Sequence, residues 1–311
     1  MKNMDPASVT SIDVGICTFR RPELRETLMS LFALEVPADA VIRLIVADND
    51  VQPSAKPLID ELRVLSPHDI TYVHCPKANI SIARNACLAE STGDFLAFID
   101  DDEAASPDWL FELYTAARAT GADAVLGPVR AIYDSMSPEW MRSGDFHSTQ
   151  PVWVRGEIIT GYTCNVLLDM HSPHIVGRRF DLALGQSGGE DTQFFTAMKD
   201  HGGRIAFAPA AILDEPVPES RASLGWLLKR RFRSGQTHGR ILAEKHRGAG
   251  RFLQAALASS KFGYCSLRSL IAAPSAVTRN RYALRAALHA GAVSGIFGVR
   301  EIRQYGMVEA S

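Results

Sequence analysis

Short apolar runs alternate with segments of helical periodicity over the first 130 residues, and this alternation constrains the fold more than any other feature. The runs are rich in β-branched residues, and the segments between them repeat their apolar residues every three or four positions. Strands that alternate with helices form a mostly parallel sheet in an open α/β fold. We predict strands at 11–17, 41–47, 70–74, 95–99 and 124–129, and helices at 23–34, 54–65, 82–90 and from Ser106 onward.

The alternation weakens after residue 130. Further strands are expected at 158–168 and 204–207, a helix at 191–201, and a loop or short helix at 137–150. The DEPVP segment, 214–218, is expected to interrupt regular structure, because proline has no amide hydrogen to donate. A long basic amphipathic helix is predicted at 223–247.

Charge is divided unevenly along the chain, although the formal net charge is only -2. Residues 1–220 carry 17 Lys and Arg against 32 Asp and Glu, whereas residues 221–311 carry 16 against 3. We therefore expect an acidic domain, 1–220, and a basic helical extension, 221–311. Such a split predicts an anionic partner for the basic part, either nucleic acid, anionic lipid or a diphosphate. The alternative is that the basic extension simply packs on the acidic domain.

Composition excludes several classes of protein. The 311 residues are 46% hydrophobic and 22% charged, as in an ordinary soluble protein. Five scattered cysteines without a C-x-x-C pair argue against a disulfide framework and against a thiolate metal site. The first residues lack a signal-peptide pattern, and the chain has no run of 18 apolar residues. We expect a cytoplasmic protein.

Three polar clusters follow predicted strands, at 18–21, 48–50 and 100–103. Ligands of open α/β sheets bind beyond the carboxyl ends of the strands. The three clusters are therefore expected at one edge of the sheet. Two acidic strand ends beside a Thr-Phe-Arg-Arg turn indicate a nucleotide site.

The cluster at 100–103 consists of four adjacent acids. Neighbouring carboxylates repel one another unless a cation or hydrogen-bond donors compensate. Alternate residues of an extended chain share a side, so Asp100 and Asp102 are expected to face one ligand. Carboxylate oxygens suit Mg²⁺ or Mn²⁺ on a diphosphate. The alternative, an acidic helix start favoured by the helix dipole, accounts for Glu103 better than for the three aspartates.

Two residues outside this cluster are further candidates. Asp48 follows a predicted strand, where its carboxylate would accept from a ribose hydroxyl or a base N–H, but Asp-Asn-Asp is also good turn chemistry. Arg84 lies near the start of a predicted helix. It is expected to hold the nucleotide or to brace the acidic cluster, with a surface salt bridge as the alternative.

Seven segments occur along the chain in the order CTFRRPE, VADND, NISIARNAC, FLAFIDDDEAASPDWL, TGYTCNVLL, GGEDTQFF and DEPVPESR. Through these segments the chain resembles glycosyltransferase family 2, whose members have the GT-A fold, over residues 11–235. Within that family it is similar to bacterial exopolysaccharide glucosyltransferases. Ala47 stands where the family more commonly has the first aspartate of its second motif, which leaves Asp48, and not Asp50, as the expected nucleotide contact.

The resemblance implies roles for single residues. Thr18 and Asp48 fall where the family holds the base and the ribose. Asp100 and Asp102 match the D-x-D motif, with Asp102 as the metal ligand, and Asp191 matches the acceptor-side general base. The residues that we expect to bind the nucleotide sugar are Thr18, Arg20, Asp48, Arg84, Asp100 and Asp101.

The implied reaction is sugar transfer from a nucleotide diphosphate sugar, a UDP-sugar by resemblance, with inversion at the anomeric carbon. Such chemistry needs a divalent cation, Mn²⁺ or Mg²⁺, to stabilise the leaving diphosphate, and a carboxylate to take the proton of the acceptor hydroxyl. Glu190 and Asp191 follow two glycines, and the alternative for both is that they cap the next helix.

Two arginines of the predicted basic helix are candidate contacts for the acceptor or the diphosphate, together with Glu190. Arg230 and Arg233 match an R-x-x-R pattern of the family and share one helix face. Arginine is suited to bidentate phosphate binding. The match is partial, because Ser234 stands where the family has tryptophan. The alternative is a solvated basic helix.

The stretch 252–299 mixes apolar pieces with arginines and is too interrupted to span a bilayer. Such a segment is typical of a protein that lies on an anionic membrane surface, with ordinary helix packing as the alternative. We therefore expect a peripheral enzyme on the inner face of the plasma membrane, with a polyprenyl-diphosphate-linked saccharide as acceptor. Nucleic acid is the less favoured partner. The competing hypothesis is a non-catalytic module that binds nucleotide sugars, membranes or nucleic acid.

Overall fold

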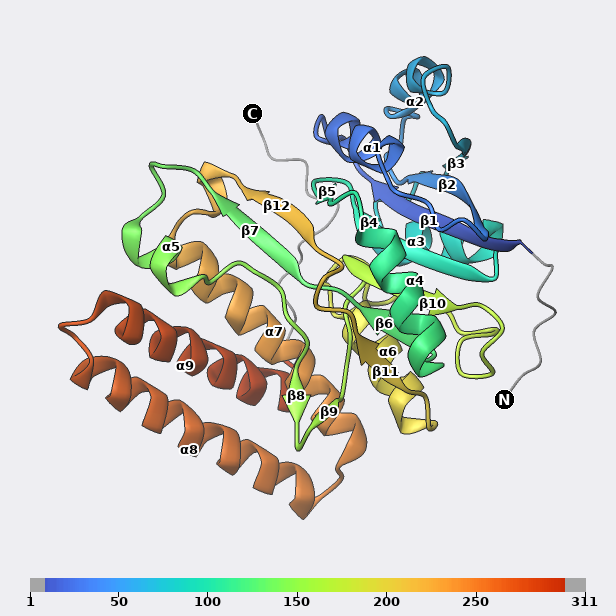
Figure 1. Ribbon diagram of the computed structural model, residues 1–311. Helices are drawn as coiled ribbons and strands as arrows, with labels where there is room; N and C mark the ends of the chain where they lie inside the picture. The colour runs from blue at the N-terminus through green and yellow to red at the C-terminus, as the bar shows by residue number, and fades with distance from the viewer. Residues whose placement is uncertain (1–8, 300–311) are drawn as a thin grey trace.

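The computed structural model describes residues 9–299, and its core is a seven-stranded sheet in the order β11-β6-β10-β4-β1-β2-β3 (Figure 1). All neighbouring pairs run parallel except those of β10, which is antiparallel to both β4 and β6. The mostly parallel α/β sheet predicted from the sequence is therefore confirmed. Its strands are β1 (Thr10–Thr18), β2 (Ala40–Asp48), β3 (Asp69–His74), β4 (Phe95–Asp100), β6 (Ala124–Leu126), β10 (Asn165–Asp169) and β11 (Ile205–Phe207).

Helices cover the sheet and bury its central strands. Eight of the nine residues of β1 are buried, as its apolar run predicts for a strand covered on both faces. Asn79 caps α3 by accepting from the Ile82 amide, and Gly121 ends α4 in the left-handed conformation. These helices are α1 (Leu24–Phe32), α2 (Lys56–Leu62), α3 (Ile80–Glu90), α4 (Trp109–Thr120) and α6 (Glu190–Asp200).

A second, three-stranded sheet was not predicted. It contains β5 (Ala104–Ala105), β12 (Leu213–Val217) and β7 (Val129–Tyr133). The expectation that 214–218 interrupts structure is therefore wrong. Pro216 pairs with Ile132 of β7, but β5 pairs only with the first two residues of β12. Pro216 thus sits where one side of the strand is an edge, which is the position that proline tolerates in a sheet.

Two predicted strands are divided in the structure. The strand expected at 124–129 ends with β6, and β7 begins three residues later in the other sheet. The strand expected at 158–168 is split into β9 (Glu157–Ile158) and β10, with β9 paired to β8 (Trp153–Val154). The remaining short elements are α5 (Glu139–Gly144) and a 3₁₀ turn, η1 (Glu219–Arg221).

Three long helices end the described part of the chain, α7 (Leu224–Lys245), α8 (Ala249–Ile271) and α9 (Ala276–Ile296), and α9 packs between the other two (Figure 1). Ser223 caps α7 by accepting from the Trp226 amide. The predicted basic helix at 223–247 is thereby confirmed, and the interrupted stretch after it forms a helical hairpin. Within residues 9–299, every helix is too short or too polar to cross a membrane.

Glycines bring α7 and α9 into close contact. Gly235 and Gly239 on α7, and Gly291 and Gly295 on α9, lie against the backbone of the other helix. A Cβ atom on any of the four would overlap a carbonyl oxygen across the interface. Both pairs have the small-xxx-small spacing that lets helix backbones approach closely. The position of α7 is therefore fixed by α9.

Candidate active site

A cavity of about 330 Å³ lies at the carboxyl ends of β1 and β4, where the sequence placed the ligand site. Its walls come from the end of β4, the start of α6, strand β12 and the first half of α7. Residues of both predicted segments, 1–220 and 221–311, thus line one cavity. The predicted site residues on its walls are Arg84, Asp100, Asp101, Asp102, Glu190, Asp191, Arg230 and Arg233.

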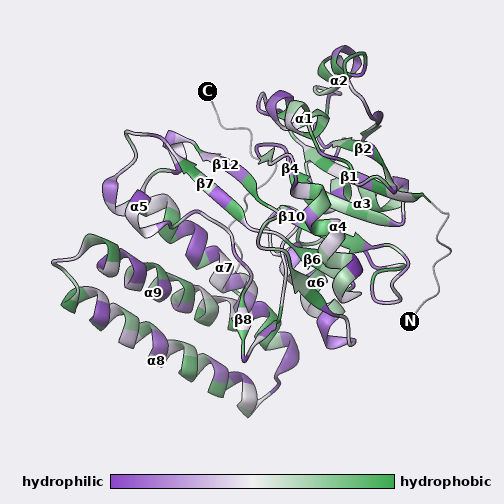
Figure 2. Ribbon diagram, viewed as in Figure 1, coloured by the Kyte–Doolittle hydropathy of each residue, from purple (hydrophilic) through white to green (hydrophobic). Residues whose placement is uncertain are grey.

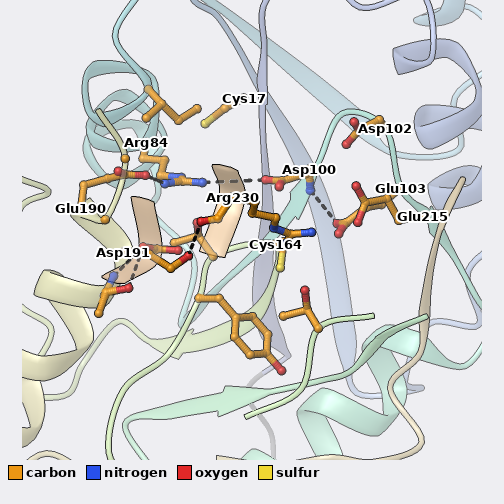
Figure 3. Close-up of a pocket in the computed structure, with 18 of the residues that line it drawn as sticks. Cys17, Arg84, Asp100, Asp102, Glu103, Cys164, Glu190, Asp191, Glu215 and Arg230 are labelled. Atoms are coloured by element: carbon orange, nitrogen blue, oxygen red, sulfur yellow. Dashed lines mark hydrogen bonds and ion pairs between the residues drawn. The ribbon is translucent and has the colours of Figure 1, made fainter. Parts of the chain in front are cut away.

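Acidic side chains crowd one wall of the cavity (Figure 3). Desolvation raises the pKa of Asp100 to about 6 and that of Asp101 to about 7, and repulsion from Asp102 adds to both effects. Glu103 is buried, accepts the Asp100 amide at 2.9 Å, and has a pKa well above its usual range, chiefly from desolvation. This wall therefore carries more carboxylates than its surroundings neutralise, which favours a cation beside it.

Arginines partly balance the charge of these acids. Arg221, from η1, places Nη2 3.3 Å from Asp102 Oδ2 and Nη1 2.9 Å from Glu215 Oε1. Arg21 lies 3.8 Å from both Asp101 and Asp102. Two guanidinium groups thus stand beside the acidic wall and offset part of its negative charge.

The donor set of this wall fits a divalent cation shared with a bound diphosphate. Among the described residues, no three His, Cys, Asp or Glu side chains form a group that encloses a metal ion by themselves. Mg²⁺ commonly takes one or two protein carboxylates and completes its shell with phosphate oxygens and water. Asp102 lines the cavity with its side chain 18% exposed, so its carboxylate can serve as such a ligand.

Arg84 joins the two acidic walls (Figure 3). Its guanidinium forms a buried ion pair with Glu190 and lies 3.9 Å from Asp100 Oδ1. Because Arg84 is only 5% exposed, the surface salt bridge is wrong, and the bracing of the acidic cluster fits its position. Desolvation raises the pKa of Glu190 to about 7, although Arg84 opposes that shift.

Asp191 stands on the wall opposite the β4 acids, in the first turn of α6 (Figure 3). The helix is capped by Gly189, whose φ of 88° is left-handed, so Glu190 and Asp191 are not the capping residues. One oxygen of Asp191 accepts from the Thr192 amide at 2.5 Å. A Cβ on Gly189 would overlap Thr237 of α7, so glycine lets α7 close over this end of the site.

The first half of α7 forms another wall. Arg230 lies over the Trp226 ring, 5.4 Å from its centroid, and His147 stacks on the same ring at 5.4 Å. Arg230 and Arg233 both line the cavity. A purely solvated basic helix is therefore wrong for this part of α7.

Three predicted nucleotide contacts lie outside the lining of the cavity. Asp48 is fully buried; its Oδ2 accepts from the Ala55 amide at 2.9 Å and the Tyr72 hydroxyl at 2.8 Å. These hydrogen bonds agree with the alternative that Asp48 has a structural role in a turn. Thr18, also buried, pairs with Asp48 in the sheet, and Arg20 donates to Asp50 at 2.8 Å. Nucleotide contacts by these three residues stay predictions.

Several cavity residues carry no role in the sequence analysis, although some of them belong to motifs that carried the resemblance. Arg21 belongs to CTFRRPE, and Glu215 and Arg221 belong to DEPVPESR, both of which carried the resemblance. The charge of these residues, within motifs that match the family, was the signal by which sequence analysis could have found them. Cys164 belongs to TGYTCNVLL, another motif that carried the resemblance. Trp226 had no comparable signal, because its approach to the site depends on how α7 packs.

Comparison with known proteins agrees with this geometry. The model of the family described as glycosyl transferase family 2 matches residues 13–182. The succinoglycan biosynthesis protein ExoM of Rhizobium meliloti is 61% identical over 306 residues, 98% of this chain and 99% of that protein. A glucosyl-dolichyl phosphate glucuronosyltransferase of Haloferax volcanii is 26% identical over 248 residues, 72% of this chain and 75% of that protein.

Solved structures show the same fold. The mannosyltransferase PcManGT from Pyrobaculum calidifontis, in complex with GDP-Man and Mn²⁺, has a TM-score of 0.62. It is 17% identical, and the match covers 94% of this chain and 89% of that one. The fold is therefore that of GT-A glycosyltransferases, with a helical C-terminal region added. With its family match and its near full-length relative in exopolysaccharide biosynthesis, the chain belongs to glycosyltransferase family 2.

Proposed function

We propose that the protein transfers a sugar from a UDP-sugar to a hydroxyl of a saccharide acceptor, with inversion at the anomeric carbon. The observation that carries the proposal is the placing of Asp100 and Asp102 opposite Asp191 across one cavity. One wall then serves the leaving diphosphate and the other the attacking hydroxyl. Attack from the side opposite the diphosphate inverts the configuration.

On the donor side, Asp102 would hold Mn²⁺ or Mg²⁺ together with the diphosphate oxygens. The bound cation supplies Lewis-acid stabilisation of the negative charge that develops on the leaving diphosphate. Arg21 and Arg221 lie within 4 Å of Asp102 and are placed to bind the same anion. The Mn²⁺ and GDP-Man present in PcManGT support a nucleotide sugar and a divalent ion in this fold. UDP as the nucleotide rests on the family resemblance.

On the acceptor side, Asp191 would take the proton of the acceptor hydroxyl. Glu190, its neighbour, is held by Arg84 in a buried ion pair. Asp191 is therefore the acid of this wall that remains available to a bound acceptor. A positioned general base contributes roughly 10²–10⁴-fold to a rate.

The acceptor is proposed to be a lipid-linked precursor of an exopolysaccharide, reached from the cytoplasmic face of the membrane. The relationship to ExoM supports a polysaccharide product. The name of the Haloferax relative includes a glucosyl-dolichyl phosphate, which supports a saccharide on a lipid carrier. The basic extension supports contact with an anionic surface.

Thermal unfolding of the purified protein tests the donor side. A ligand that binds only the folded state raises the melting temperature by mass action. We expect stabilisation by UDP with Mn²⁺ that is lost in EDTA, and a smaller effect of GDP. Equal stabilisation with and without the metal would contradict the metal-dependent site. Binding without turnover of any UDP-sugar would favour the non-catalytic module.

A further inference from the structure

Helix α8 packs on α9 and lies on the outer side of the C-terminal helices (Figures 1 and 2), and several of its large apolar side chains are exposed. Leu270 is 75% exposed and Ile271 is 63% exposed, values unusual for leucine and isoleucine. Their exposed neighbours along the helix extend this surface over more than four turns. The α8 face consists of Leu253, Leu257, Tyr264, Leu267, Leu270 and Ile271.

The opposite side of α8 carries small residues. Ala255, Ala258 and Cys265 are the buried residues of the helix. A helix that packs on a soluble core normally buries its large apolar residues and exposes polar ones. Helix α8 does the reverse, so its apolar face is built for a partner outside the described fold.

The charged residues around this face are all basic. Residues 249–299 contain six Lys and Arg and no Asp or Glu. Arg268 of α8 and Arg285 of α9 both lie over the ring of Tyr282, at 5.3 and 5.8 Å from its centroid. Within residues 9–299, neither guanidinium makes an ion pair with a carboxylate. Two like charges therefore lie at one aromatic ring beside the α8 face, where an anionic phosphate group would interact favourably with them.

We propose that the α8 face lies on an anionic bilayer, with a lipid phosphate held between Arg268 and Arg285. This inference deepens the membrane part of the proposed function and rests on it, but it does not depend on the transfer reaction. A basic helix with an apolar face inserts at the headgroup boundary without spanning, which agrees with the absence of a spanning helix from residues 9–299.

The same observations disfavour other partners. In a symmetric dimer through the α8 face, each copy would bring an identical basic border to the other, and like charges would meet. Nucleic acid would pair with the arginines but would leave the leucines exposed to water. The bilayer alone satisfies both the apolar side chains and the charges.

Vesicle co-sedimentation of the full chain tests the apolar contribution. The double variant Leu267→Gln with Leu270→Gln keeps the charge unchanged and removes two apolar contacts. We expect its partition onto phosphatidylcholine vesicles with 30 mol% phosphatidylglycerol to fall about tenfold or more. The matched control is Leu65→Gln, which changes a leucine that is 64% exposed far from α8 and should bind like the wild type.

The charge contribution is tested by Arg268→Gln with Arg285→Gln. At about 1 kcal/mol per basic residue, binding to the anionic vesicles should fall roughly 30-fold, and 0.5 M NaCl should remove most of the difference. The control, Lys77→Gln with Arg179→Gln, removes two exposed charges elsewhere. If the two charge variants bind the anionic vesicles equally well, Arg268 and Arg285 do not form a phosphate site.

Two other outcomes would contradict the proposal that α8 binds a membrane. Equal binding of the wild type and the leucine variant to vesicles would do so, as would a dimer that the leucine variant breaks, measured by sedimentation. Competition by poly(U), but not by vesicles, would assign the arginines to nucleic acid. Thermal stabilisation by UDP and Mn²⁺, measured on the same variants without lipid, reports the donor site separately, so the two proposals fail independently.

Discussion

Arg221 and Asp102 meet across the cavity although 119 residues separate them in the chain, with Nη2 3.3 Å from Oδ2. Arg221 also holds Glu215 of β12 at 2.9 Å. The aspartate expected to bind the metal is therefore already paired with a cation. If Asp102 holds a metal ion, a bound diphosphate would be the anionic partner that remains for Arg221.

Replacing Asp102 with asparagine should remove the dependence of donor binding on metal. The amide keeps the shape of the side chain but is a poor ligand for Mn²⁺ or Mg²⁺. We expect the affinity for UDP with Mn²⁺ to fall at least tenfold, to the level measured in EDTA, by titration calorimetry. Asp60→Asn, at a half-exposed side chain of α2, is the control and should bind normally. Retained metal dependence in the Asp102 variant would place the ligand elsewhere.

Asp191→Asn should separate binding from turnover. The donor lies against the β4 wall in our proposal, so its affinity should change less than threefold. The rate of sugar transfer should fall about 10²–10⁴-fold, because the acceptor hydroxyl loses its base. Both quantities are measured with the same UDP-sugar. A variant with normal turnover and weakened donor binding would assign Asp191 to the donor instead.

Gly291→Ala should destabilise the protein through the contact of α9 with α7. The added methyl group would overlap the Phe232 carbonyl oxygen, and such overpacking costs about 1–3 kcal/mol. We expect a fall in melting temperature of several degrees and reduced transfer activity, because α7 carries one wall of the cavity.

Gly263→Ala in α8 is the matched control. Nothing lies within 4 Å of the position where its Cβ would stand. Alanine in an exposed helix interior is favoured over glycine by about 1 kcal/mol, so this variant should melt at the same temperature or slightly higher. If both variants melted alike, the close packing of α7 on α9 would not matter for stability.

His147 should make the fold less stable as pH falls. Burial lowers the pKa of His147 from 6.5 to about 4. Between these two pH values His147 is protonated in the unfolded chain and neutral in the folded chain. Its contribution is complete above pH 6.5 and is lost as pH falls towards 4. Between pH 6.5 and 5 the loss is about 2 kcal/mol.

Denaturant unfolding of the wild type and His147→Gln over this pH range checks the expectation. Carboxylates with raised pKa values, such as Glu190, act in the opposite direction, but they are common to both proteins and cancel in the difference. The free-energy difference between the two proteins should therefore change with pH in the stated direction. A difference that is constant with pH would show that His147 titrates normally.

Much of the catalytic half was predictable because local pattern and tertiary position agree there. The apolar run before Asp100 forms β4, and the polar clusters of neighbouring strands do converge. The strand that contains Pro216 was not predictable. A sheet tolerates proline there only because β5 ends before Pro216 and leaves that side of β12 unpaired. The engagement of Asp48 by Tyr72 likewise comes from a neighbouring strand. Contacts between distant segments leave no periodic trace in a single sequence.

The glycine contacts of α7 with α9 have a consequence for how such an enzyme would find its acceptor. Because backbone meets backbone, we expect the helical hairpin and the cavity wall to move together. Seating α8 on a bilayer would then set the direction in which the cavity mouth opens. An acceptor carried by a lipid would reach the cavity by lateral diffusion in two dimensions. Every such acceptor would then meet the cavity mouth in the same orientation.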